Sequence, residues 1–223
     1  MKLKINLKEA ELTKADVKHD ERLLRRIQTL VDVVYGLVLF QLFLLLPMPT
    51  SEQIAERRVW EALTEHGPEL MTVVVGVVWI ILYWGQSNTQ FGYLKRTNKT
   101  LSALSIIQLF TLMLYLYFIK LDNDTDGDVL ALFMQSVFLA IGGFIGAFSW
   151  KYAAVNGMHF KELSEEKQYS IYHDFMPEPL AALVTIPFAF LGVGWYTLGW
   201  LSVIPLGILF KKMAKNKISS PSE

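Results

Sequence analysis

The sequence predicts an all-α integral membrane protein with six transmembrane helices per subunit and with both the N and C termini in the cytoplasm. Its apolar residues form blocks about as long as a bilayer is thick, charged segments separate these blocks, and Lys and Arg gather on alternate connections. Hydrophobic residues make up 52% of the 223 residues, and the mean hydropathy is +0.33. A span needs roughly 20 mostly apolar residues to cross about 30 Å of hydrocarbon. This pattern excludes a soluble enzyme and intrinsic disorder.

Charge and cysteine content exclude further classes. The 21 Lys and Arg residues balance 21 Asp and Glu residues, whereas nucleic-acid-binding proteins usually carry a basic face. We therefore expect no nucleic acid partner. The chain contains no cysteine, which excludes disulfides, thiolate metal sites and a cysteine nucleophile.

We expect a basic cytoplasmic leader at 1–26, a six-span transmembrane domain at 27–210 and a basic cytoplasmic tail at 211–223. The first four apolar blocks are long and uninterrupted, as membrane spans require. They predict spans at about 27–48, 69–86, 101–119 and 129–150.

The last apolar stretch, residues 180–210, is too long for one crossing at modest tilt. As a single helix it would be about 46 Å long. A Gly-Val-Gly sequence at 192–194 lies near its middle and can form a tight turn. We therefore expect two short spans, at about 180–191 and 195–210.

The distribution of basic residues tests this count independently. With six spans, eighteen Lys and Arg residues fall on the side of the termini, and only Arg57, Arg58 and Lys120 fall on the other side. Lys and Arg favour the cytoplasmic side of a membrane protein. Both termini are then cytoplasmic, which requires an even number of spans.

Ionisable residues are scarce in the predicted spans, where each costs roughly 2.5 to 3.5 kcal/mol on insertion scales. Asp32 in the first span is the one clear case. An intramembrane aspartyl protease needs two carboxylates, and a metalloprotease needs clustered ligands. A proton-coupled transporter usually needs a relay of such groups. We therefore predict no catalytic residues, no cofactor and no metal centre.

Asp32 needs a partner if it is charged within the membrane. Arg26 precedes it by six residues, about 120° around a helix, so the two cannot form the usual i, i+4 pair. If Asp32 is paired, the candidate partners are Arg26 and the Trp84 indole, brought in by neighbouring helices. The alternative is that Asp32 lies at the membrane interface and is hydrated.

A second feature of the first span is a stripe formed by Leu37, Gln41, Leu44 and Met48. These positions share one helix face. In one interpretation the stripe faces a pore, with Leu37 and Leu44 as hydrophobic constrictions that gate by dewetting. In the other, Gln41 hydrogen-bonds to a neighbouring helix in a packed bundle.

The connection after the third span contains a weak calcium candidate. Asp122, Asp124 and Asp126 precede a glycine in the order that begins a calcium loop. The position of the expected bidentate glutamate is Phe133, inside the fourth predicted span. A solvated acidic turn is the default interpretation.

Arg26 and Asp32 also frame a recognisable sequence, because they match an R-x-x-x-F-S-D pattern in which Leu30 and Val31 replace Phe and Ser. A second pattern ends the second span, Y-W-x-x-H-H-x-x-F followed by a basic turn, and Ser87 and Asn88 stand at the two histidine positions. The matching residues of this second pattern are Tyr83, Trp84, Phe91, Arg96 and Asn98. With these patterns the chain resembles the prokaryotic members of the TMEM175 family of potassium-permeable channels, over about residues 26–210.

The resemblance implies a homotetramer of six-helix subunits in a prokaryotic inner membrane, around a pore lined by the first helix. Potassium or other monovalent cations and membrane lipid are the implied partners. By the same resemblance the constriction falls at Leu37, with Gln41 and Leu44 further along. Arg26, Asp32 and Trp84 would belong to a network that anchors the helix.

The chain also departs from the family. A threonine that the family often places eight residues after the aspartate is Phe40 here, and the Ser of F-S-D is Val31. These departures leave open an alternative function, a non-conducting membrane sensor or scaffold of the same fold. Such a protein would use the segment from His159 to Lys167 as a partner surface.

Overall fold

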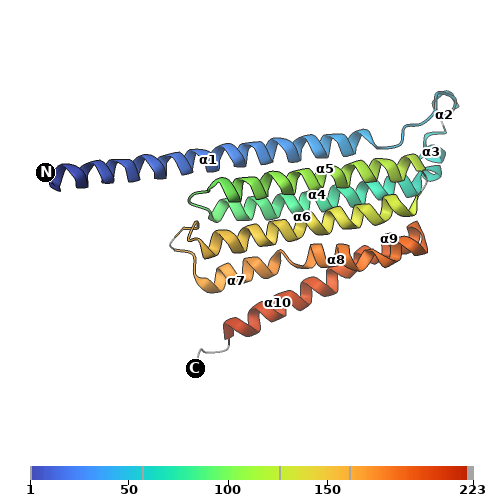
Figure 1. Ribbon diagram of the computed structural model, residues 1–223. Helices are drawn as coiled ribbons and strands as arrows, with labels where there is room; N and C mark the ends of the chain where they lie inside the picture. Colours follow the sequence, from blue (N-terminus) through green and yellow to red (C-terminus); the bar gives the residue numbers. More distant parts are fainter. Residues whose placement is uncertain (1, 57, 126, 161, 220–223) are drawn as a thin grey trace.

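The computed structural model describes residues 2–56, 58–125, 127–160 and 162–219, and all regular elements within these residues are helices. Six helical segments are long and apolar enough to cross a membrane, which confirms the predicted all-α fold with six candidate membrane spans. They are Val17–Leu44, Glu69–Tyr93, Lys99–Thr125, Val129–Val155, Glu165–Leu191 and Val193–Asn216. The spans lie side by side in one elongated bundle (Figure 1).

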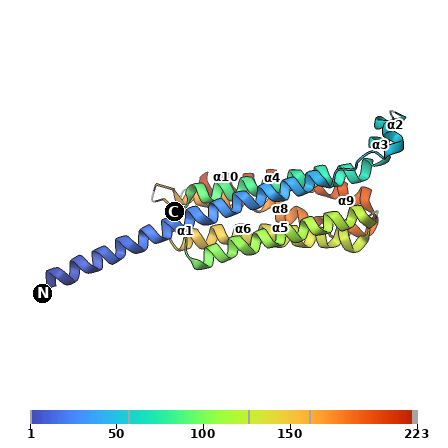
Figure 2. The ribbon, with the colours of Figure 1, turned by 90° about the horizontal axis from the view of Figure 1, so that it is seen from above.

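The first helix, α1 (Lys2–Leu44), includes the predicted leader and continues into the first span without a break. Its N-terminal part extends well beyond the rest of the bundle (Figures 1 and 2). The helix ends four residues before the predicted limit at Met48. Pro47 and Pro49 explain this, because a proline disfavours helical geometry in the residue before it.

Two short helices, α2 (Ser51–Ala55) and α3 (Val59–Glu65), connect the first two spans and project from the opposite end of the bundle (Figure 2). Thr50 and Gln53 form a capping box at the start of α2, which satisfies two backbone donors that the helix leaves free. The Gln53 amide also donates a hydrogen bond of 2.7 Å to Glu65 of α3. These polar contacts give the connection a defined structure.

Three long helices form the centre of the bundle: α4 (Gly67–Tyr93), α5 (Lys99–Thr125) and α6 (Val129–Val155). Local capping sets two of their starts. Oδ1 of the Asn98 side chain accepts from the Leu101 backbone N–H at 2.9 Å, and the Asp128 carboxylate accepts from the Leu130 backbone N–H at 2.9 Å. Small residues on α6 then allow close packing, since a Cβ on Gly146 would lie 2.7 Å from Nε2 of Gln108.

The last two spans are built from shorter pieces. The elements α7 (Glu165–Asp174), α8 (Pro177–Thr185) and the 3-10 helix η1 (Pro187–Leu191) form one span. The chain then turns at Gly192, whose φ of 98° favours glycine. The second span consists of α9 (Val193–Gly199), η2 (Trp200–Ser202) and α10 (Val203–Ser219).

One candidate span starts earlier than the predicted span. The fifth candidate span begins at Glu165, whereas the sequence suggested a start near Leu180, because prolines and charges at 174–179 look like a connection. Asp174 and Glu178 therefore fall within a candidate span, and Asp32 is not the one ionisable residue there.

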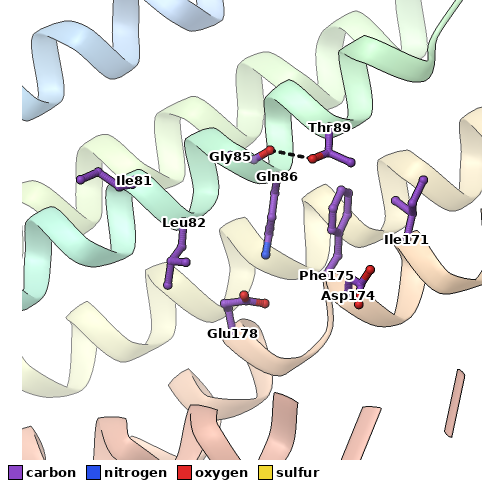
Figure 3. Close-up of a pocket in the computed structure, with 9 residues that line it drawn as sticks. All are labelled: Ile81, Leu82, Gly85, Gln86, Thr89, Ile171, Asp174, Phe175 and Glu178. Atoms are coloured by element: carbon purple, nitrogen blue, oxygen red, sulfur yellow. Dashed lines mark hydrogen bonds between the residues drawn. The ribbon is translucent and has the colours of Figure 1, made fainter. Parts of the chain in front are cut away.

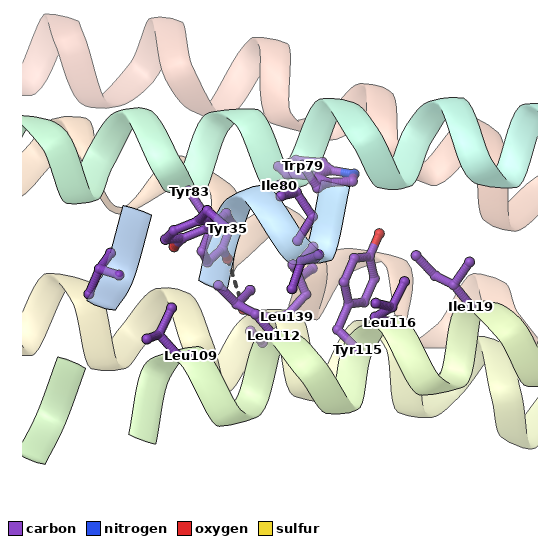
Figure 4. Packing of buried hydrophobic residues seen from close by; sticks show 14 of the residues in the cluster. Tyr35, Trp79, Ile80, Tyr83, Leu109, Leu112, Tyr115, Leu116, Ile119 and Leu139 are labelled. Carbon is purple, nitrogen blue, oxygen red and sulfur yellow. Dashed lines mark hydrogen bonds between the residues drawn. The ribbon is translucent and has the colours of Figure 1, made fainter. Parts of the chain in front are cut away.

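The core lies where α1, α4, α5 and α6 meet (Figure 4). Tyr35, Tyr83 and Tyr115 are almost fully buried in it. Burying a hydroxyl is costly unless it is hydrogen-bonded, and Tyr83 donates to the Leu139 carbonyl at 2.8 Å. The core therefore fixes α4 against α6 as well as filling space.

Candidate pore-lining helix and its anchors

The membrane-spanning part of α1 has one buried face and one exposed face. The buried face packs against α4 and α5, and its side chains follow a helical repeat of three and four residues. They are Leu24, Ile27, Val31, Tyr35, Val38 and Leu42. The remaining sides of the helix are left uncovered by the chain itself.

Leu37, Gln41 and Leu44 all lie on the uncovered side. Leu37 is 57% exposed and Leu44 is 63% exposed. Gln41 is also exposed and, among the described residues, makes no hydrogen bond to another helix of its own chain. The interpretation that Gln41 holds the bundle together within one subunit therefore has no support, and the stripe is free to face a pore or a second subunit.

Two hydrogen bonds join α1 to α4, here called the α1–α4 bonds. The Trp84 indole N–H donates to Oδ1 of Asp32 at 3.2 Å. About one turn further along, the hydroxyls of Tyr35 and Ser87 lie 3.3 Å apart. Both bonds join residues 52 positions apart in the sequence. Because α1 and α4 run in opposite directions (Figure 1), the two bonds slant in opposite directions, and together they hold α1 against α4.

The second tie was missed from the sequence. Tyr35 reads as an ordinary apolar core position, and Ser87 stood out only as a departure at a histidine position of the family pattern. The spacing of these residues provides no signal for this pair. The helices α1 and α4 run in opposite directions (Figure 1), so the residues that follow a contacting pair on each helix move apart along the axis.

Arg26 is not part of this contact. It is exposed and lies beside a shallow hollow of about 460 Å³ that is lined by Arg25, Thr29, Leu30 and Val33 as well. Within the described residues Arg26 forms no ion pair with Asp32. The guanidinium instead shares the uncovered side of α1 with Leu37, as the 120° separation from Asp32 leads one to expect.

The acidic connection does not form a calcium loop in the described residues. Asp122 and Asp124 belong to the last turns of α5, where Asp122 is buried and Asp124 is exposed. Asp126 lies outside the described residues. Asp128 caps α6. Helical geometry explains the difference, because residues two apart on a helix point in different directions.

Comparison with known proteins finds a similar family. Residues 26–115, which include α4 and most of α5, match the family model described as "Endosomal/lysosomal potassium channel TMEM175". This part of the chain is similar to the TMEM175 family. Its matched segment contains both α1–α4 bonds and the exposed stripe of α1. The family is one of channels and not of enzymes.

Two solved TMEM175 structures have the same fold. A lysosomal potassium-selective channel TMEM175 homolog from Chamaesiphon minutus is 16% identical with a TM-score of 0.67, over 87% of this chain and 99% of that chain. A variant of the potassium channel MtTMEM175, solved in complex with a nanobody–MBP fusion protein, is 17% identical with a TM-score of 0.55. That match covers 86% of this chain and 93% of the other. None of the curated proteins matches.

Proposed function

We propose that this chain is a subunit of a passive, potassium-permeable cation channel whose hydrophobic constriction is formed by α1. The family supports the channel class. The stripe of Leu37, Gln41 and Leu44 supports the assignment of the pore to α1, because the chain leaves this face of its first span uncovered. Several copies are needed to enclose a pore, and the proposed assembly is a homotetramer.

The constriction is proposed at Leu37. A ring of leucine side chains narrows a pore and repels water, so ions pass only when the ring widens. Gln41 lies one turn further along and offers amide oxygens to a partly dehydrated cation. Leu44 would form a second apolar ring. Potassium and other monovalent cations are the proposed permeant ions. They would pass down their own concentration gradients, so transport needs no energy source.

The anchoring role is assigned to Asp32 and Trp84. Because these residues fix α1 on α4, they set how far Leu37 projects toward the proposed axis. Tyr35 and Ser87 share this role, and Arg26 is placed at the proposed pore entrance, on the same side of α1 as Leu37. Changing an anchor should alter conduction without touching the constriction.

The proposed orientation has both termini in the cytoplasm of a prokaryotic cell. The eighteen-to-three distribution of Lys and Arg supports this. The start of α1 and the end of α10 also lie at the same end of the bundle (Figure 1), as an even number of crossings requires.

A non-conducting sensor or scaffold of the same fold is the second candidate. The observation that favours it is an exposed apolar pair, Val155 and Phe160, at the connection between α6 and α7. A backbone bridge between Leu94 and His159 orders this connection. The expected helix begins only at Glu165, so a partner would meet an irregular loop there.

Ion flux separates the two candidates. Purified protein in liposomes should pass potassium down its gradient, and Leu37→Ala should increase the flux because it widens the ring. Ile106→Ala is a matched control, since Ile106 is an exposed apolar residue on α5. If neither the native chain nor Leu37→Ala passes potassium while the oligomer is intact, the result would favour the sensor.

A further inference from the structure

A cavity of about 360 Å³ lies between α4, α7 and α8, away from the exposed stripe of α1 (Figure 3). Its apolar walls come from both sides of the gap. Ile81 and Leu82 line it from α4, and Ile171 and Phe175 line it from α7 and its end. A volume of this size is typical of small-molecule sites, which combine apolar walls with a few polar groups.

Two polar side chains face each other across this cavity. Gln86 extends from α4 toward Glu178 of α8 (Figure 3). Gln86 is only 9% exposed, and its side chain interacts with the Glu178 carboxyl group across the cavity. That contact is not a well-aligned hydrogen bond, because the Gln86 amide atoms and Oε2 of Glu178 are buried without a closely placed partner. Buried polar atoms are nearly always paired, so a third hydrogen-bonding group would complete this pair.

The charge around the cavity favours a cation. Asp174 lines it together with Glu178, and none of the described lining residues is basic. Lys211 of α10 acts on Glu178 from outside the lining. A cationic group would be attracted to this acidic lining.

The walls select among cations. An alkali ion would need several more oxygen ligands than Glu178 and Gln86 supply. It would also make no apolar contact with the walls of the cavity. An organic ammonium ion fits both parts, because its N–H groups can donate to Glu178 and to the Gln86 oxygen. Its hydrocarbon part would lie against Leu82 and Phe175, and the Phe175 ring adds a favourable face for a cation.

We propose that this cavity binds an organic ammonium group, with Glu178 as the counter-ion and Gln86 as the hydrogen-bonding partner. Two sources carry this chemistry: a free alkylamine and the headgroup of an aminophospholipid. The site is separate from the proposed pore, and its occupancy is measured without ion flux. The proposed amine binding can therefore be tested independently of the channel assignment.

The test is a binding titration of the full-length protein in micelles with n-hexylammonium chloride, at constant ionic strength. n-Hexanol supplies the same apolar chain without the charge. We expect the amine to bind, hexanol to bind far more weakly, and Glu178→Gln to weaken amine binding at least about tenfold, since a charge-assisted hydrogen bond is lost. Equal binding of amine and alcohol would overturn the proposal.

A second variant covers the case in which Glu178→Gln folds poorly. Gly85 lines the cavity, and a Cβ added there meets nothing within 4 Å. Gly85→Leu should therefore fill the cavity and abolish amine binding. The matched control is Gly92→Leu on the same helix, where a Cβ also has open space and which does not line this cavity. Undiminished amine binding by Gly85→Leu would overturn the proposed site.

Native mass spectrometry distinguishes the two sources. Retention of phosphatidylethanolamine in preference to phosphatidylcholine, lost in Glu178→Gln, supports a lipid headgroup, because choline has no N–H to donate. Amine binding without such lipid preference supports a free amine. Neither lipid preference nor amine binding by the folded native chain would contradict the proposal.

Discussion

The Trp84 indole donates a hydrogen bond to the Asp32 carboxylate at 3.2 Å and thereby ties the first membrane span to the second. An aspartate in a span is costly unless it is paired or hydrated. The bond gives Asp32 a partner while leaving it partly exposed. With α1 held in this rotation, Leu37 and Leu44 lie on its uncovered side.

A double-mutant cycle should measure this tie. Trp84→Phe removes the donor, Asp32→Ala removes the acceptor, and the coupling energy should be roughly 0.5 to 1 kcal/mol, as for hydrogen bonds between membrane helices. Reversible unfolding in mixed micelles provides the free energies. If the changes in unfolding free energy of the two single variants simply add in the double variant, the bond does not stabilise the fold.

The buried hydrogen bond between Tyr35 and Ser87 should contribute more to the free energy of unfolding than its 3.3 Å length suggests. Tyr35→Phe leaves the Ser87 hydroxyl without this partner in a buried place, so we expect a loss of about 1 kcal/mol in unfolding free energy. Adding Ser87→Ala should cost little further, because both partners are then gone. A double variant much less stable than Tyr35→Phe would contradict this interpretation.

Close packing on α6 should make one glycine intolerant of a methyl group. A Cβ at Gly143 would lie 2.8 Å from Cβ of Pro179 on α8, and overpacking of this kind costs roughly 1 to 3 kcal/mol. Gly143→Ala should lower the thermal unfolding temperature. Gly36→Ala is the matched control, because a Cβ there meets nothing within 4 Å, and it should leave that temperature unchanged or raise it.

The orientation can be read by cysteine labelling, because the native chain has no cysteine. Ser51 and Glu162 are exposed residues of connections at opposite ends of the bundle. In intact cells a membrane-impermeant maleimide should label the Ser51→Cys variant and spare the Glu162→Cys variant, which should react only after lysis. The reverse pattern would place the termini outside.

Much of the fold could be predicted from hydropathy alone, because an apolar block of bilayer length has few alternatives to a helix. The turn at Gly192 was also predicted, because a Gly-Val-Gly sequence lies in the middle of an apolar stretch that is too long for one span. The fifth span could not be located correctly, since Glu178 and three nearby prolines, Pro177, Pro179 and Pro187, resemble a connection when tertiary packing is unknown. Packing of α8 on α6 keeps this segment in the bundle.

The site was predictable only where it depends on one helix. The face shared by Leu37, Gln41 and Leu44 follows from helical periodicity. The partnership of Asp32 with Trp84 was one of two candidates, because a sequence does not reveal which helices touch. The cavity at Gln86 and Glu178 could not be predicted at all, since it requires α4 and α8, about 90 positions apart in the chain, to meet.

The most direct test of the account is potassium flux into liposomes that contain the purified protein, with sodium as the comparison ion and Leu37→Ala as the variant. We predict potassium flux that exceeds sodium flux and rises in Leu37→Ala, while Ile106→Ala behaves like the native chain. An intact oligomer that passes neither ion, with or without the Leu37 side chain, would contradict the assignment of a channel gated at α1.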